Sequence, residues 1–216
     1  MSNFDLCIST ASGMELLVGA PNLAAKSSGM IDSLATQETL ARLVAPLETL
    51  RLFIRVAEEY PDVKVASNFI PPRSLYCHLG LNQAFEHLST MMHTAADLMG
   101  GTTVTGQSTE DLAHPTLGPR LNQFFSRPGF TGDQVLRLAP FIQDLTCSRY
   151  AMREELYVRY SLADVLHKRQ TIYLAADCQS LEQKVWQVLD SATQEEAARL
   201  AQAGAVSEGA DSEARE

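Results

Sequence analysis

The sequence lacks any apolar run near the roughly 20 residues that a helix needs to span a bilayer. It also lacks a basic excess, since 17 lysines and arginines stand against 26 acidic residues and give a formal net charge of -9. A surface of that sign does not neutralise phosphates or anionic lipid headgroups. We therefore expect no nucleic-acid partner and no membrane partner. Because the first residues lack the basic start of a signal peptide, we also expect a cytoplasmic location.

Cysteine is scarce and scattered. No Cys-x-x-Cys pair occurs, and no histidine lies at zinc-finger spacing from a cysteine. We therefore predict no metal site and no disulfide framework. Buried free thiols are the expected state of the four cysteines, which are Cys7, Cys77, Cys147 and Cys178.

Motifs for independent catalysis are also missing. The chain has no Gly-rich phosphate fingerprint and no nucleophile elbow. The acidic pairs Glu58-Glu59 and Glu195-Glu196 lie at the ends of predicted helices, where solvated carboxylates are common. The sequence therefore gives no basis for catalysis by this chain alone.

Helical periodicity is the strongest positive signal. Apolar residues recur at steps of three and four along four segments, and Pro61 and Gly100-Gly101 mark the ends of the first two. Such stripes are typical of helices that bury one face. The sequence therefore predicts an all-α, up-and-down helical bundle. The four stripes are Leu43-Leu47-Leu50-Ile54-Ala57, Leu81-Phe85-Leu88-Met92-Ala95-Met99, Val135-Leu138-Ile142-Leu145 and Leu181-Val185-Val188-Ala192.

The segments outside these stripes are less regular. Residues 4–26 predict a further helix that Pro21 kinks or terminates. Residues 63–72 favour an extended connector because they end in two prolines. We expect one helical domain over residues 1–192 and an acidic, fraying or disordered tail over residues 193–216.

Two stretches carry a family resemblance. The more specific one is Cys-Ser-Arg-Tyr-Ala-Met-Arg-Glu-Glu-Leu-Tyr at residues 147–157. It resembles the run Gly-Ser-Glu-Phe-Gly-x-Arg-x-Glu-Leu-Tyr of the 4-hydroxyphenylacetate 3-hydroxylase family of flavin monooxygenases. The Ser, the Arg and the Glu-Leu-Tyr triplet match as they stand, and Tyr150 replaces the Phe conservatively. Cys147, Arg149 and Ala151 depart from the pattern.

The other stretch covers residues 101–115. It resembles the family's loop from a helix-ending Gly, through a Pro-Ser pair, to Asp-Leu-x-x-Pro. Gly106 and Gln107 replace the Pro-Ser pair, whereas Ser108 fits and can cap the helical turn that follows it. Weaker agreement in the helix around Glu48 extends the resemblance over roughly residues 5–190.

The resemblance implies the fold and the cofactor. Family members have a helical N-terminal domain, a β-barrel and a helical C-terminal domain, in the architecture of the acyl-CoA dehydrogenases. This chain resembles the last of these. In the family the segment matching Ser148 to Ala151 lies against the flavin, and the C-terminal helices also build a tetramer. The aromatic substrate is held by the N-terminal part, which nothing here matches.

The resemblance therefore implies a role in hydroxylating phenols that resemble 4-hydroxyphenylacetate, with reduced FAD supplied by a partner reductase. Arg149 adds a positive charge where relatives carry a negative one, which suits a phosphate or indicates a lost flavin contact. The chain is then a fragment, or a subunit whose catalytic portion is encoded separately. The candidate flavin-binding residues are Ser148, Arg149, Tyr150, Ala151, Arg153, Thr105, Gln107 and Ser108.

Plain structural roles are the alternatives for several of these residues. Arg153 is either part of the flavin-site scaffold or an ordinary ion-pair partner, and Glu155 and Arg159 have the spacing of a helix salt bridge. Tyr150 and Tyr157 are more typical of core or interface aromatics than of catalytic groups.

Two other functions stay open. A stand-alone oligomerisation module, which kept the fold and lost the cofactor, is favoured by the substitutions at Arg149, Gly106 and Gln107. A relative of the hydroxybutyryl-CoA dehydratases is the third hypothesis, although those enzymes need cluster-ligating cysteines from regions with no match here. All of these hypotheses leave apolar helix faces exposed on the isolated chain, and homo-oligomerisation would cover them.

Overall fold

The computed structural model describes residues 2–61, 70–100, 106, 108–161, 165–193 and 195. The chain divides into two compact units, Met1–Ile172 and Tyr173–Glu216. Throughout the described ranges the regular secondary structure is helical. None of the helices in these ranges combines the length and apolar character that crossing a membrane requires.

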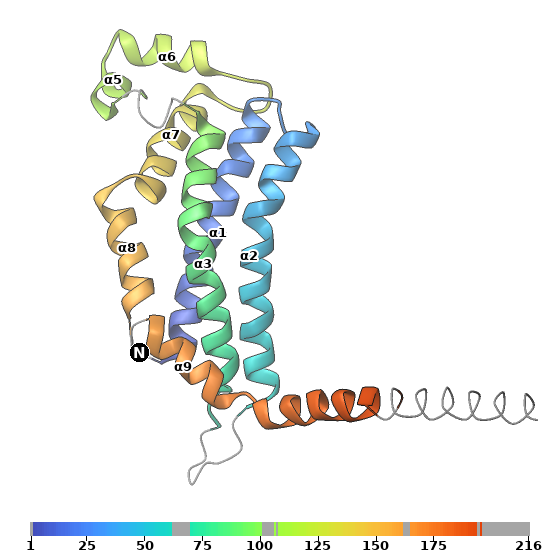
Figure 1. Cartoon of the computed structure of the whole chain (residues 1–216). Coiled ribbons are helices and arrows are strands. Elements are labelled where there is room, and N and C mark those ends of the chain that lie inside the picture. The colour runs from blue at the N-terminus through green and yellow to red at the C-terminus, as the bar shows by residue number, and fades with distance from the viewer. Residues whose placement is uncertain are drawn as a thin grey trace, which may run out of the picture. The chain divides into compact units, whose positions relative to one another are not determined.

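An up-and-down bundle forms the first unit (Figure 1). Its three long helices, α1 (Asn3–Ser27), α2 (Leu34–Glu59) and α3 (Ser74–Met99), alternate in direction and pack against one another. The fourth side is formed by α7 (Gly132–Thr146) followed by α8 (Arg149–Tyr160), both of which contact α3. The predicted all-α, up-and-down bundle is therefore confirmed.

Shorter helices complete the unit. α5 (Thr109–Ala113) and α6 (Leu117–Phe125) lie at one end of the bundle, and α9 (Val165–Ala175) begins near the other end (Figure 1). Ser108 caps α5, because its hydroxyl accepts from the Asp111 N–H and its own N–H donates to the Asp111 carboxylate. The cap predicted at Ser108 is confirmed.

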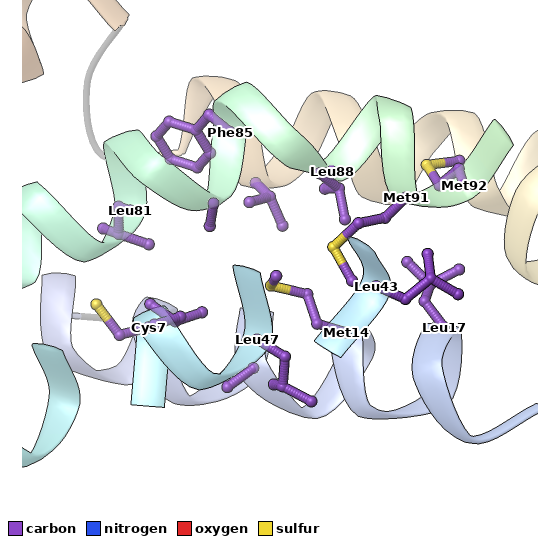
Figure 2. Close-up of a cluster of buried hydrophobic side chains, with 14 of the residues drawn as sticks. Cys7, Met14, Leu17, Leu43, Leu47, Leu81, Phe85, Leu88, Met91 and Met92 are labelled. Atoms are coloured by element: carbon purple, nitrogen blue, oxygen red, sulfur yellow. The ribbon is translucent and has the colours of Figure 1, made fainter. Parts of the chain in front are cut away.

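The core lies between the long helices, where the predicted stripes meet. Figure 2 shows leucine and methionine side chains of α1, α2 and α3 pointing toward one another. Leu43 and Leu50 of α2 and Leu81 of α3 are completely buried. Truncating any of these leucines to alanine costs about 2–5 kcal/mol in comparable cores, so this seam dominates the stability of the unit.

Pro21 does not terminate α1, which continues to Ser27. An interior proline removes one backbone hydrogen bond and costs about 3 kcal/mol or more. Here the Pro21 ring is buried, and the neighbouring Ala20 and Ala24 are buried as well. Burial of apolar surface offsets the lost bond. α2 and α7 likewise run through Pro46 and Pro140.

The fourth predicted stripe forms a helix in the second unit, over residues 178–193. Its apolar side chains are not covered in this unit, since Leu181 and Val185 are 58% exposed and Trp186 is 65% exposed. The predicted helix is confirmed, but its apolar stripe is exposed and not buried as the sequence pattern indicated. Of the predicted tail, only residues 193 and 195 lie within the described part of the chain.

Two glycines allow close backbone contacts among α5, α6 and α7. A Cβ on Gly118 would overlap the Leu112 carbonyl, and a Cβ on Gly132 would overlap the Asn122 carbonyl. The Asn122 side chain also accepts from the N–H of Asp133, just after Gly132. The start of α7 is therefore held directly against α6.

Replacing Gly132 with alanine should separate these two helices. We expect Gly132→Ala to lower the free energy of unfolding by about 1–3 kcal/mol, the usual cost of overpacking, measured by urea denaturation. Gly19 is the matched control, because it lies on the exposed face of α1 with open space around it. Gly19→Ala should raise stability by about 0.5–1 kcal/mol. A Gly132→Ala protein as stable as the parent would contradict the close contact.

His78 is a buried titratable group near the start of α3. Its Nε2 lies 3.2 Å from the side-chain nitrogen of Asn3, and its Nδ1 is buried without a partner among the described residues. Burial lowers the pKa of His78, and the charges of Lys168 and His167 lower it further. The folded protein therefore keeps this imidazole neutral at a pH where the unfolded chain protonates it.

Acid should destabilise the protein through His78. As pH falls below about 6.5, the unfolded state binds a proton that the folded state does not bind, so the free energy of unfolding decreases. A His78→Gln variant should lose this component, which is measured as the difference in stability between parent and variant from pH 8 to pH 5. A difference that stays constant over this range would show that His78 titrates alike in both states.

Candidate functional site

The break between α7 and α8 is the centre of the candidate site. The N–H groups of Cys147 and Ser148 both donate to the Gln143 carbonyl, at 2.8 and 3.1 Å, which ends α7. Ser148 then adopts an extended backbone conformation, and α8 starts at Arg149. The segment from Ser148 to Ala151 is therefore helical from Arg149 onward, because Ser148 caps a new helix there.

The Ser148 hydroxyl connects the two helices. It accepts from the Ala151 N–H at 3.2 Å and donates to the Asp144 carbonyl at 2.7 Å. Ala151 itself is buried in the core. Ser148 and Ala151 therefore fix where α8 starts and how it faces, and the Ser148 hydroxyl has no donor left for a ligand.

Exposed donors remain at the start of α8. Within the part of the chain that the structure describes, the backbone N–H groups of Arg149 and Tyr150 have no acceptor, and neither does the Arg149 guanidinium. The partial positive charge of a helix N-terminus lies at the same place. This arrangement fits an anionic group such as a phosphate.

The flanking charged residues are mostly paired. Arg153 is 78% exposed and lies 3.5 Å from Glu154, and Arg159 binds Glu155 at 2.9 Å. The ion-pair interpretation of Arg153 thus has a structural basis, although an exposed pair at this distance contributes little stability. Tyr150 is 56% exposed, so it is not a core aromatic.

A groove of about 260 Å³ opens beside this helix start, between α1 and α8. Leu88 and Met92 of α3 line it together with Tyr150 and Ala151. Its lining is mainly apolar, with carboxylates of α8 and serine hydroxyls of α1 among the polar groups. A flat apolar molecule or side chain fits such a surface.

The α1 side of the groove was not predicted from the sequence. Ser9, Ser12 and Gly13 line it, as does Thr10, whose buried hydroxyl has no hydrogen-bond partner among the described residues. Small polar residues within an otherwise apolar helix were the available signal. A buried hydroxyl without a partner is uncommon and costs stability, so Thr10 is a notable feature of the groove's wall.

The second predicted stretch lies apart from the first. Ser108 is at the start of α5, at the end of the bundle, whereas α8 begins farther along it (Figure 1). No hydrogen bond or ion pair joins Ser108 to α8 within the described ranges. Thr105 and Gln107 lie outside the described residues. The structure therefore supports Ser108 as a helix cap and brings only the residues of the first stretch together.

The cysteines do not assemble into a metal site. Cys7 and Cys77 are buried as predicted, but Cys147 is exposed and Cys178 partly so, because the helix break and the second unit leave them uncovered. A hydrogen bond with Cys77, together with burial, raises the pKa of Cys7, so its thiol stays protonated. Among the described residues no group of three metal-ligating side chains occurs.

The bundle matches a known protein family. The family model described as "4-hydroxyphenylacetate 3-hydroxylase C terminal" matches residues 1–190. The chain belongs to this family. The match spans the whole bundle, including the break between α7 and α8 and the groove beside it.

Curated relatives of this hydroxylase family are longer than the chain. The oxygenase component of 4-hydroxyphenylacetate 3-monooxygenase from Thermus thermophilus is 26% identical over 160 residues, which are 74% of this chain and 33% of that protein. The oxygenase component of 4-nitrophenol 4-monooxygenase/4-nitrocatechol 2-monooxygenase from Rhodococcus opacus is 24% identical over 147 residues, 68% and 28% of the two proteins. The chain thus spans about a third of the length of these relatives.

Solved structures confirm the fold. The oxygenase component of 4-hydroxyphenylacetate 3-monooxygenase complexed with FAD superposes with a TM-score of 0.79 at 21% identity, covering 89% of this chain and 40% of that one. An archaeal 4-hydroxybutyryl-CoA dehydratase from N. maritimus gives a TM-score of 0.67 at 18% identity, covering 79% and 35%. The bundle is thus of the type shared by these enzymes.

Removing the Ser148 hydroxyl should destabilise the junction between α7 and α8. We expect Ser148→Ala to lower the free energy of unfolding by about 1 kcal/mol, because the N-cap of α8 and the bond to α7 are both lost. Chemical denaturation measures the change. Ser161→Ala is the control, since the Ser161 hydroxyl donates to the Tyr157 carbonyl of its own helix and to no other described residue. Equal losses in both variants would argue against a special role for Ser148.

Proposed function

We propose that this chain supplies the helical, flavin-covering part of a reduced-FAD-dependent hydroxylase that acts on aromatic phenols resembling 4-hydroxyphenylacetate. The proposal rests on the start of α8, where N–H groups and a guanidinium without an acceptor among the described residues lie beside a mainly apolar groove. Membership of the hydroxylase family and the FAD named in a similar structure support flavin as the ligand.

The residues at the start of α8 suit the polar part of the cofactor. The Arg149 and Tyr150 N–H groups, with the Arg149 guanidinium, would hold a phosphate or another anionic edge. Arg153 would add charge nearby at the cost of a weak pair with Glu154. Ser148 and Ala151 are positioning residues in this proposal, because the Ser148 hydroxyl is engaged in its cap.

Bound reduced flavin would supply the oxygen-activating chemistry, and the protein would supply position and dryness. The groove contributes to dryness through its apolar lining from α1, α3 and α8. The second predicted stretch, with Thr105, Gln107 and Ser108, remains a candidate for further flavin contact. Of residues 105–108, the structure describes only Gly106 and Ser108.

The substrate site and the remaining flavin contacts would come from a separate catalytic portion. The chain spans 28–33% of the curated relatives' length, and these relatives are named oxygenase components, a term that implies a second component. We infer that a flavin reductase supplies the reduced cofactor. Residues 1–192 would form the flavin-covering domain, and residues 193–216 an acidic tail.

Homo-oligomerisation, as a tetramer in this family, is part of the same proposal. The exposed apolar side chains on α8 and on the helix at residues 178–193 favour it. They equally favour the second candidate function, a stand-alone oligomerisation module that has lost flavin and catalysis. Flavin binding separates the two, because only the first candidate requires it.

Anaerobic calorimetric titration of the full chain with reduced FAD tests the proposal. We expect saturable binding, and we expect Arg149→Ala to weaken it about 5- to 10-fold, since a charge-assisted contact contributes roughly 1–1.4 kcal/mol in this exposed position. Arg153→Ala should weaken it less, because Arg153 is already paired.

Arg42→Ala is the control for net charge. Arg42 is exposed on α2, and its one ion-pair partner among the described residues is Glu38 of the same helix. Equal weakening by Arg42→Ala and Arg149→Ala would mean that the bulk charge and not the start of α8 attracts FAD. Absence of any saturable binding, in a chain that forms a defined oligomer by light scattering, would favour the oligomerisation module.

A further inference from the structure

A second hollow, of about 260 Å³, lies at the end of the bundle near the turn between α6 and α7. Met30, after α1, and Met99 of α3 line it, with Phe125 of α6 and Leu138 of α7. Its lining is predominantly apolar. Its described lining shares no residue with that of the groove beside α8, so the two hollows can be tested separately.

Arg127 is the one charged residue among the described residues of this lining. A tight turn fixes it: the N–H and carbonyl groups of Arg127 and Phe130 are mutually hydrogen-bonded, and Gly129 takes a φ of +80° after Pro128. Proline followed by a glycine of positive φ is the pattern of a type II turn. The backbone of Arg127 is therefore held at the edge of the hollow.

The guanidinium is oriented as well. Its Nη1 donates to the Phe124 carbonyl at 3.0 Å and to the Ser126 carbonyl at 2.9 Å. These two bonds use both hydrogens of Nη1. Nε and Nη2 have no partner within the described part of the chain. Together these two nitrogens form the edge of a guanidinium that binds a carboxylate through two parallel hydrogen bonds.

The other polar groups of the hollow do not compete for that edge. The hydroxyls of Ser27 and Ser28 donate to backbone carbonyls of α1. Among the described residues of the lining there is no acidic side chain. A ligand with an anionic head and an apolar body therefore meets charge at Arg127 and apolar surface elsewhere.

We propose that this hollow binds a small amphiphilic carboxylate, with an apolar body of about one aromatic ring. The volume limits the size of the body, because pockets for drug-sized ligands begin at about 300 Å³. The carboxylate binds the Nε and Nη2 edge of Arg127, and the ring packs against Met99, Phe125 and Leu138.

Titration of the full chain with 3-phenylpropionate, followed by calorimetry and by backbone amide NMR, tests this proposal. The neutral 3-phenylpropan-1-ol serves as the probe without charge. We expect the acid to bind at least ten times more tightly than the alcohol, with the largest shifts around residues 127–138. Equal binding of acid and alcohol would overturn the role of Arg127.

Two variants identify the residue. Arg127→Met should reduce binding of the acid to that of the alcohol. Arg120→Met, which removes an exposed charge of α6 outside the lining, should leave the tenfold preference unchanged. Equal losses in both variants would overturn the proposal.

Arg127→Met also removes the hydrogen bonds from the guanidinium to the Phe124 and Ser126 carbonyls, which could disturb the end of α6. A third variant therefore tests the hollow with Arg127 in place. Val135→Phe fills the hollow and leaves Arg127 in place. It should weaken acid and alcohol alike, and unchanged binding of both would overturn the proposal. Flavin titration is unaffected by either outcome, because the α8 site contains none of these residues.

Discussion

The two hydrogen bonds of the Ser148 hydroxyl are the constraint on which the candidate site depends. One bond caps α8 and the other holds the last turn of α7, so the fourth side of the bundle is broken at a defined residue. A continuous helix would have buried the N–H groups of Arg149 and Tyr150 in its own hydrogen bonds. The break leaves them available, whereas Ala151 in the same turn of α8 is packed in the core.

Binding and positioning are thus divided among neighbouring residues. Ser148 and Ala151 hold the start of α8 in place, whereas the Arg149 guanidinium has no partner within the described residues. This charge lies at the positive end of the α8 dipole, and a helix N-terminus with such a charge is an arrangement that suits an anion. The groove between α1 and α8 adds an apolar surface next to these donors.

The bundle was predictable because its helices carry regular stripes, and Leu43, Leu50 and Leu81 are buried as those stripes indicated. The cap at Ser108 was predictable because a helix cap depends on residues only three positions apart in the sequence. The groove was not, because it depends on how α1 packs beside α8. The burial of Cys147 was mispredicted, since no stripe indicated that the break would expose it.

The most direct test of the account is anaerobic amide NMR of the full chain during titration with reduced FAD. If flavin binds at the start of α8, the amide resonances of Arg149 and Tyr150 shift in a saturable way, together with those of the α1 segment that lines the groove. Saturable shifts confined to other helices would contradict flavin binding at the start of α8. The absence of any saturable shift on titration with reduced FAD would contradict it as well.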